Sequence, residues 1–426
     1  MIRILKYGEV DIEEIFDRAL PEVDVEAAVA QIIRDVRENG DQAVLAYAEK
    51  FDHAKLTSLL VSEEEMEEAM ASMEPEFLRI LEKAADNIRA FHEKQKRGSF
   101  ILSEKEGVVL GQKVMPVERA GLYVPGGTAA YPSTVLMDSI PAKIAGVKEV
   151  AIATPPDSSG KVHPEILAAA KIAGVDRIYK TGGAQAIAAL AYGTETIRKV
   201  DKIVGPGNAF VAEAKKQVFG RVAIDMIAGP SEILIVSDGK MNPAYTAADM
   251  LSQAEHDRMA SAVLVTDSME FALAVQAELE KQIPQLLRAE IARASIERNG
   301  KIIVADSIDA VIDIANEIAP EHLELCLDNP FDYLDRIRNA GSVFMGRNCP
   351  EALGDYFAGP NHTLPTGGTA RFSSPLSVDD FIKKTQFIYY TEQALKEVAE
   401  DVAFFAEKEG LTGHARSAVI RTETVK

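Results

Sequence analysis

Short apolar segments alternate with helical segments from Gly121 to Met345, and this alternation limits the folds that the chain can adopt. One series of expected strands occupies residues 121–124, 149–154, 177–180 and 202–204, and a second occupies residues 232–237, 261–266, 301–305 and 342–345. Expected helices lie between them, near residues 133–145, 164–173, 184–192, 243–256, 269–282 and 308–318. A parallel sheet covered by helices on both faces produces such a pattern. The sequence therefore predicts an α/β fold built from two successive α/β units.

The segments outside this alternation are expected to be mostly helical. Residues 25–51 have apolar residues at helical spacing with a break at Gly40, and Ser62 with Glu65 forms a capping box that starts a second helix. Pro75 starts a third helix, which extends to about residue 96. Residues 100–117 alternate and predict a hairpin, and residues 391–407 predict a C-terminal helix.

Charge and cysteine content exclude several classes of function. Asp and Glu number 66 and Lys and Arg number 46, which gives a net charge of −20 that repels a nucleic-acid backbone. No apolar run approaches the roughly 18 residues that a membrane-spanning helix needs, and charged residues interrupt the N-terminal segment. We therefore expect a cytoplasmic protein without a membrane anchor or a secretory signal. The two cysteines, Cys326 and Cys349, are too few for a disulfide framework or a thiolate zinc site, and we expect them to be structural.

Three Gly-rich turns, at residues 123–128, 181–185 and 205–208, each follow an expected strand and precede an expected helix. Backbone N–H groups at such strand ends can bind a phosphate. Gly205 and Gly207 are followed by Phe210 where a dinucleotide-binding fingerprint needs a third glycine, so that fingerprint is absent. The residues alone are consistent with a ligand at the strand ends or with plain tight turns.

A metal site in this chain would have to use imidazole, carboxylate and amide ligands. Gln253 and His256 share a face at the end of an expected helix. Asp355 lies in a long stretch rich in Gly and Pro, and His414 lies near the C-terminus. These four side chains could form a mixed nitrogen and oxygen site suited to zinc or manganese. Spacing does not fix which ligands converge, and each segment taken alone could be a solvated helix end or a surface tail.

Acid–base groups occur in the same part of the chain. Glu321 and His322 are adjacent in a turn, where neighbouring side chains can reach one pocket and transfer protons there. The stretch of residues 354–371 also contains His362, and a polar loop of this length is usually functional. Glu409 adds a carboxylate near the C-terminus. The sequence therefore predicts proton transfer close to the candidate metal site.

Seven motifs, taken together and in this order, resemble the L-histidinol dehydrogenase family. They are GLYVPGG at 121–127, GGAQAI at 182–187, VGPGN at 204–208, AGPSE at 228–232, SQAEH at 252–256, APEHL at 319–323 and NHTLPTGG at 361–368. The resemblance extends over nearly the whole chain. It implies two large α/β domains with incomplete Rossmann-like units, one inserted in the other, plus small N- and C-terminal arms.

The resemblance also implies a division of the chain and a homodimer with active sites shared between subunits. The expected parts are an N-terminal arm (1–18), a first large α/β domain (19–120 and 236–376), an inserted NAD-binding domain (121–235) and a C-terminal arm (377–426). The arms are expected to cross to the partner.

The resemblance assigns roles to individual residues. One zinc ion per subunit would be bound by Gln253, His256, Asp355 and His414. The substrate would contact Ser231, His322, His362 and Glu409 in addition to the zinc ligands. NAD would contact Tyr123, Gln185 and Asn208, and the catalytic residues would be Glu321 and His322.

The implied reaction is the oxidation of L-histidinol to L-histidine through the aldehyde, with reduction of two NAD⁺, as the last step of histidine biosynthesis. A related dehydrogenase of another small diol, such as a sulfonated propanediol, would keep the zinc and base motifs. The Glu409 carboxylate favours a cationic amino substrate over a sulfonate. A zinc hydrolase with Glu321 as the base would explain the metal ligands but would leave the Gly-rich turns without a role. Neither nucleic acid nor a membrane is expected as a partner.

Overall fold

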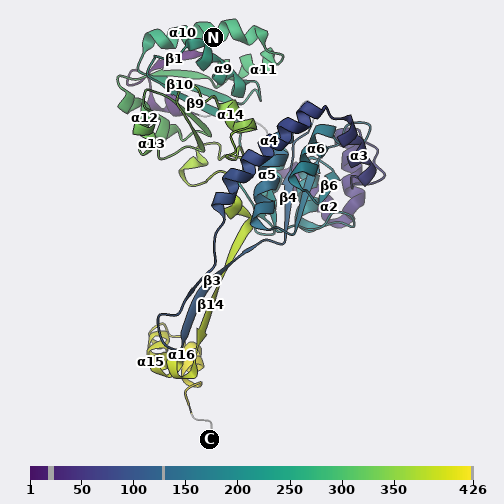
Figure 1. Cartoon of the computed structure of the whole chain (residues 1–426), viewed down its shortest axis with the longest axis vertical. Coiled ribbons are helices and arrows are strands. Elements are labelled where there is room, and N and C mark those ends of the chain that lie inside the picture. The colour runs from purple at the N-terminus through teal and green to yellow at the C-terminus, as the bar shows by residue number, and fades with distance from the viewer. Residues whose placement is uncertain (18–23, 127–129, 424–426) are drawn as a thin grey trace. The chain divides into compact units, whose positions relative to one another are not determined.

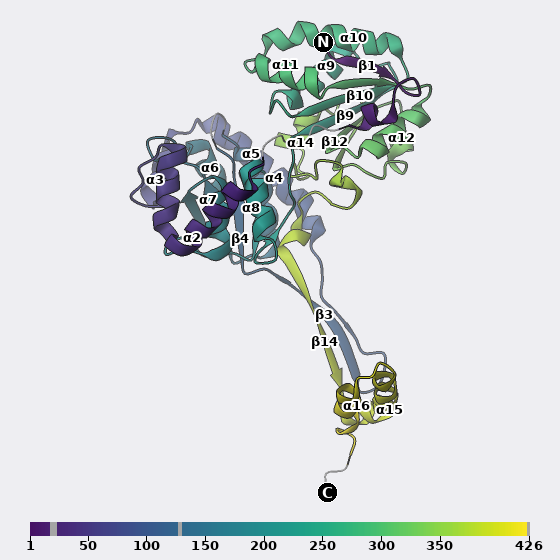
Figure 2. The same cartoon turned by 180° about the vertical axis from the view of Figure 1, so that it is seen from behind.

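The computed structural model describes residues 1–17, 24–126 and 130–423, which form two compact units (Figure 1 and Figure 2). The first unit contains Met1–Gln95 and Val117–Phe381, and the second contains Lys96–Pro116 and Ile382–Lys426. The expected boundary at residues 18–19 and the end of the first Gly-rich turn, at residues 127–128, fall outside the described residues. No helix in the described ranges is long and apolar enough to cross a lipid bilayer.

A five-stranded parallel sheet forms one half of the first unit. Its strands lie in the order β6 (Arg177–Lys180), β5 (Glu149–Thr154), β4 (Arg119–Tyr123), β7 (Lys202–Val204) and β8 (Ala223–Ile224). The chain winds outwards from β4 to β6 and then continues on the other side of β4. The winding therefore reverses between β4 and β7, and open α/β sheets bind ligands at the carboxyl ends of such a strand pair.

Helices cover both faces of this sheet, and Figure 1 shows them around β4 and β6. One face carries α3 (Glu63–Ser72), α4 (Pro75–His92), α5 (Pro132–Ala145) and α6 (Pro164–Ala173). The other carries α2 (Glu26–Tyr47), α7 (Gly183–Tyr192) and α8 (Ala209–Val218). Successive strand residues alternate between the two cores, so Leu122 packs into the first and Tyr123 into the second. This double burial explains the apolar strands in the sequence.

A six-stranded parallel sheet forms the other half. Its order is β1 (Arg3–Lys6), β11 (Lys301–Val304), β10 (Ser261–Thr266), β9 (Glu232–Ser237), β12 (His322–Cys326) and β13 (Ser342–Met345). Its faces are covered by α9 (Pro243–Ala254), α10 (Met269–Gln282) and α11 (Ala289–Arg298) on one side, and by α1 (Ile12–Phe16) and α12 (Ile308–Ile318) on the other. The short helices α13 (Phe331–Leu334) and α14 (Glu351–Tyr356) follow β12 and β13.

The two sheets share one topology. If the edge strand β1 is set aside, both place their strands, numbered within each half, in the spatial order third, second, first, fourth, fifth. The predicted α/β fold with two successive α/β units is thus confirmed. The expected break at Gly40 is confirmed as well, with φ 52° and ψ −132° inside α2, and so is the capping box between Ser62 and Glu65.

The second unit consists of an antiparallel sheet and two helices. The strands β14 (Ile382–Tyr390), β3 (Val108–Pro116) and β2 (Phe100–Leu102) lie side by side in that order. The expected hairpin corresponds to β2 and β3, and the expected C-terminal helix to α15 (Glu392–Lys408), which packs against α16 (Thr412–Val419). Between the two helices, Ala403, Ala406 and Ala415 form a small buried cluster, and Val419 packs against it.

Two segments lie elsewhere than the expected domain division places them. The helices α2, α3 and α4 were grouped with residues 236–376, but they pack on the five-stranded sheet because their apolar faces complete its two cores. The N-terminal segment was expected to be a crossing arm, but β1 pairs with β11 of the same chain, with Arg3 opposite Lys301.

Candidate active site

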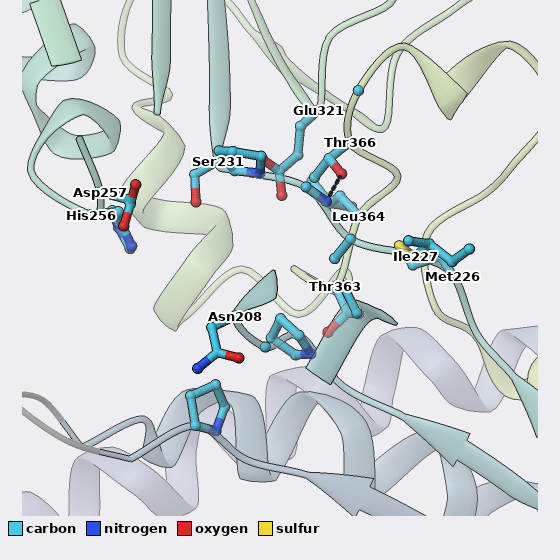
Figure 3. Close-up of a pocket in the computed structure, with 18 of the residues that line it drawn as sticks. Asn208, Met226, Ile227, Ser231, His256, Asp257, Glu321, Thr363, Leu364 and Thr366 are labelled. Carbon is cyan, nitrogen blue, oxygen red and sulfur yellow. Dashed lines mark hydrogen bonds between the residues drawn. The ribbon is translucent and has the colours of Figure 1, made fainter. Parts of the chain in front are cut away.

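A cavity of about 1000 Å³ connects the two halves of the first unit. The five-stranded half lines it with residues that follow strands, at 206–209 after β7 and at Asp225 after β8. The six-stranded half lines it with residues at strand starts, namely Ser231 before β9 and Glu321 and His322 at β12. Figure 3 shows Asn208 across the cavity from Ser231 and Glu321. The carboxyl edge of one sheet therefore faces the amino edge of the other.

The Gly-rich turn after β7 requires glycine at Gly205. Its φ is 109°, and a Cβ there would lie 2.2 Å from the carbonyl oxygen of Tyr123. The turn is anchored from below by a buried ion pair between Lys215 and Asp225. Asp225 Oδ2 accepts the Gly205 N–H at 2.8 Å, and Lys215 Nζ donates to the Gly205 carbonyl oxygen at 3.0 Å. Sequence reasoning missed both anchors, because nothing near Lys215 marks it as the partner of a turn.

The three predicted NAD contacts have different surroundings. Asn208 lines the cavity, and its Oδ1 caps α8 by accepting N–H groups from Phe210 and Val211. Tyr123 is buried, its hydroxyl accepts the Gly183 N–H at 3.0 Å, and burial raises its pKa to about 12. Gln185 is also buried, against Gly183. Both side chains therefore contact Gly183 of the second Gly-rich turn from the buried side.

The predicted catalytic pair, Glu321 and His322, lies on the wall formed by the six-stranded half. The Glu232 N–H donates to Glu321 Oε2 at 2.8 Å, and burial raises the pKa of Glu321 to about 8. His322 Nδ1 lies 2.9 Å from the carbonyl oxygen of Glu232 and 3.6 Å from Glu321 Oε2. Burial lowers the pKa of His322, but the carboxylates of Glu321 and Asp355 outweigh it and raise that pKa to about 10.

The other nitrogen of His322 belongs to a group of side chains that could hold a cation. His322 Nε2 lies 3.9 Å from Glu351 Oε1 and 3.8 Å from Asp355 Oδ1. One ligand atom from each of the three lies within 4.8 Å of the others. In the described residues, His322 Nε2 and Glu351 Oε1 are buried without a hydrogen-bond partner. Buried polar atoms are rarely left unpaired, so this donor set fits a bound cation or a polar ligand.

Three of the four predicted zinc ligands meet at this cavity. Gln253, His256 and Asp355 all line it, and the Gln253 side chain also interacts with the Glu351 carboxylate. The imidazoles of His322 and His362 lower the pKa of Asp355 despite its burial. Burial lowers the pKa of His256, which favours the neutral imidazole that a metal requires.

The fourth predicted ligand, His414, and the predicted substrate contact Glu409 belong to the second unit. Glu409 caps the C-terminal end of α15, His414 lies in α16, and both are exposed. They are not among the residues that line the cavity of the first unit.

The last predicted site residue, His362, lies in the stretch that follows α14. Its Nδ1 is 3.1 Å from the Asp355 carbonyl oxygen and its Nε2 is 3.2 Å from the Thr134 hydroxyl of α5. Nearby, the Gly229 N–H donates to the Thr366 hydroxyl at 2.6 Å, a contact that Figure 3 marks with a dashed line. This stretch therefore forms part of the cavity wall and is fixed at several points.

Glu351 is a site residue that sequence reasoning missed. Its Oε2 accepts from the Ser252 hydroxyl at 2.9 Å, and its backbone N–H donates to Glu324 at 2.8 Å. A signal was present, because Glu351 and Asp355 are four residues apart and share one face of a helix.

The chain is similar to known proteins over nearly its whole length. The family model described as histidinol dehydrogenase matches residues 17–422. Histidinol dehydrogenase from Clostridium acetobutylicum is 52% identical over 426 residues, 99% of each chain, and that from Geobacillus kaustophilus is 56% identical over 396 residues, 93% of each chain. The crystal structure of histidinol dehydrogenase from Elizabethkingia anophelis has a TM-score of 0.93 at 40% identity and covers 99% of this chain and 98% of that chain. On these grounds, the chain belongs to the histidinol dehydrogenase family.

Proposed function

We propose that this protein oxidises L-histidinol to L-histidine through the aldehyde, as the last step of histidine biosynthesis, with two NAD⁺ as acceptors and one zinc ion per subunit. One observation carries the proposal. Two buried proton-transfer groups, Glu321 and His322, lie side by side on a cavity wall that faces a Gly-rich strand-end turn. Proton transfer from the substrate hydroxyl and hydride transfer from the carbon that bears it could therefore take place in one cavity.

His322 suits the proton transfer of the first oxidation. Its Nδ1 lies 2.9 Å from the Glu232 carbonyl oxygen, which can only accept, so Nδ1 carries a hydrogen and Nε2 is the nitrogen that exchanges a proton. The neighbouring carboxylates favour the protonated ring, and a cation held beside Nε2 would oppose them and favour the neutral ring that acts as a base. Nε2 would accept the proton of the histidinol hydroxyl while the carbon that bears this hydroxyl loses a hydride to NAD⁺, which gives the aldehyde, NADH and a proton on His322.

Glu321 suits the second oxidation, which needs a water molecule. Its carboxylate points into the cavity (Figure 3) and one oxygen is fixed by the Glu232 N–H. Above its raised pKa of about 8, the ionised Glu321 is a stronger base than an ordinary carboxylate, and it would accept a proton as water adds to the aldehyde carbon. The carbon of the hydrated aldehyde would then lose a hydride to a second NAD⁺. The products are the carboxylate, NADH and protons.

Gln253, His256 and Asp355, together with His414 of a second copy of the chain, would hold the zinc ion. When bound, zinc supplies a fixed positive charge that orients the imidazole and amine of histidinol. The chain itself places these ligands beside His322 Nε2 and Glu351 Oε1, two buried atoms that have no hydrogen-bond partner among the described residues. Chelation should abolish activity and added zinc should restore it. Full activity in a preparation that elemental analysis shows to be metal-free would refute this part of the proposal.

Asn208, Tyr123 and Gln185 would form the NAD site at the carboxyl ends of β7, β4 and β6, respectively. Asn208 offers a cavity-facing amide, and the two buried residues keep the second Gly-rich turn in shape. The decisive assay supplies histidinol and NAD⁺ and follows NADH by its absorbance. Turnover of a sulfonated diol but not of histidinol would favour the related diol dehydrogenase.

The proposal includes a homodimer in which the second unit completes the partner's site. Within the described residues, this unit exposes large apolar side chains on β2, β14 and α15, including Ile101, Ile388 and Phe405 at 67%, 74% and 69%. Burial of such side chains stabilises an interface. Mixing the inactive variants His414→Asn and His256→Asn under subunit exchange should restore about half of the activity per mixed dimer, because one of its two sites is intact. A mixture that stays inactive after exchange is demonstrated by mass would show that His414 acts within its own chain.

A further inference from the structure

One face of α5 contacts three consecutive residues of the stretch that carries His362. The Thr134 hydroxyl lies 3.2 Å from His362 Nε2, the Met137 carbonyl oxygen accepts from Asn361 Nδ2 at 2.6 Å, and Asp138 Oδ1 accepts from the Thr363 hydroxyl at 2.8 Å. Positions 137 and 138 lie three and four residues after position 134, which places all three on one side of the helix. Helix α5, which covers the five-stranded sheet, therefore fixes the part of the cavity wall that carries His362.

Asp138 is the unusual member of this face because a carboxyl group is fully buried there. It is 0% exposed, and its Oδ2 has no hydrogen-bond partner among the described residues. The charged groups that act on it are Asp225 and Lys215, the pair that anchors the Gly205 turn. Burying a carboxyl group without a full set of hydrogen bonds costs free energy of folding, which indicates a role beyond packing.

We propose that Asp138 is a positioning residue for substrate binding: through the Thr363 hydroxyl it fixes residues 361–363 and thereby the His362 imidazole in the cavity wall. The inference rests on the proposed function, since it takes His362 as a contact of histidinol. Thr363 is also fixed from its other side, because its carbonyl oxygen accepts the Leu376 N–H at 2.9 Å and its own N–H donates to Asn361 Oδ1 at 2.8 Å. The hydrogen bond to Asp138 is thus the contact by which the Thr363 side chain joins residues 361–363 to α5.

The protonation state of Asp138 determines which substitution is conservative. Burial raises the pKa of Asp138 to about 8, so the group is mainly a neutral acid at pH 7. An asparagine amide is also neutral, has nearly the same shape and keeps an oxygen that accepts from Thr363. Asp138→Asn is therefore expected to preserve the contact, whereas Asp138→Ala removes it.

The test measures kcat, separate KM values for histidinol and NAD⁺, and the melting temperature Tm. Asp138→Ala should raise KM for histidinol by about 10-fold, the effect of one buried hydrogen bond, and leave KM for NAD⁺ within about 2-fold. Asp138→Asn should restore KM for histidinol. Ser139→Ala is the matched control, since Ser139 is equally buried on the same helix and its hydroxyl makes no hydrogen bond within the described residues.

A second variant keeps the proposal testable if Asp138→Ala does not fold. Thr363→Val removes the same hydrogen bond from the other partner with little change in shape, and it should raise KM for histidinol by a similar factor. Combining it with Asp138→Ala should add little, because both remove one contact. A lower Tm with unchanged KM for histidinol, or an Asp138→Asn variant as impaired as Asp138→Ala, would overturn the inference.

Failure of the proposed function would give a different result. A wild-type enzyme that does not oxidise histidinol would refute the function and leave the positioning role to be decided by crystal structures. In that case, residues 361–363 should be displaced in Thr363→Val and unmoved in Ser139→Ala. Unmoved residues 361–363 in Thr363→Val would refute the positioning role.

Discussion

The two halves of the first unit have one strand order but contribute opposite edges to the cavity. The five-stranded half contributes residues that follow β7 and β8, whereas the six-stranded half contributes residues at the starts of β9 and β12. Carboxyl ends of parallel strands present Gly-rich turns and helix N-termini, which suit a phosphate-containing cofactor. The amino edge of the second sheet presents Glu321 and His322 instead.

This difference shows that one topology can serve two purposes within a chain. In the five-stranded half, the buried pair Lys215–Asp225 holds a turn and leaves its backbone available. In the six-stranded half, buried carboxyl and imidazole groups themselves face the cavity. We therefore expect substitutions in the two halves to separate chemistry from cofactor binding.

The largest effect is expected from His322→Asn. Both oxidations transfer a proton from the reacting oxygen, so kcat should fall by about 10³-fold with histidinol and with the aldehyde supplied separately. Affinity for NADH, measured by fluorescence titration, should stay within about 2-fold, because the Gly-rich turns belong to the other half. Loss of NADH binding together with turnover would contradict the separation of the halves.

A smaller and more selective effect is expected from Glu321→Gln. Only the second oxidation needs an activated water, so oxidation of the aldehyde should slow by about 10²-fold while oxidation of histidinol to the aldehyde changes little. Single-turnover measurements with each substrate distinguish the two steps. Equal losses in both steps would show that Glu321 acts in protein structure or in substrate binding and does not activate water.

The sequence predicts the strands well where both faces are buried, because apolar runs such as residues 232–237 leave few alternatives. It did not predict β12 as a strand, since Glu324 interrupts the apolar run and its carboxyl group is buried against the backbone N–H of Glu351. The position of α2, α3 and α4 was also not predictable, because their apolar faces fit either sheet until tertiary packing is known.

The candidate site was predictable as far as local motifs reach. Gln253, His256 and Asp355 were expected together and do line one cavity, as do Glu321 and His322. Lys215, Glu351 and Asp138 were missed. Their roles depend on contacts with distant turns and helices, such as the one from Asp138 to Thr363.

The smallest effect, and the finest test of the comparison, uses the two asparagines that cap helices in the two halves. Asn208 caps α8 and lines the cavity, whereas Asn242 caps α9 by accepting the Ala244 N–H at 3.0 Å and does not line it. Asn208→Ala and Asn242→Ala should each reduce the free energy of unfolding by about 1 kcal/mol through loss of the cap. Only Asn208→Ala should also raise KM for NAD⁺, by about 10-fold, because only its amide faces the cofactor side of the cavity.

Asn208→Asp keeps the cap but places a carboxylate beside the phosphates of NAD⁺, so it should raise KM for NAD⁺ while preserving Tm. Equal KM values for NAD⁺ in Asn208→Ala, Asn242→Ala and wild type would show that Asn208 is only a cap, and that the cofactor does not approach the carboxyl end of β7.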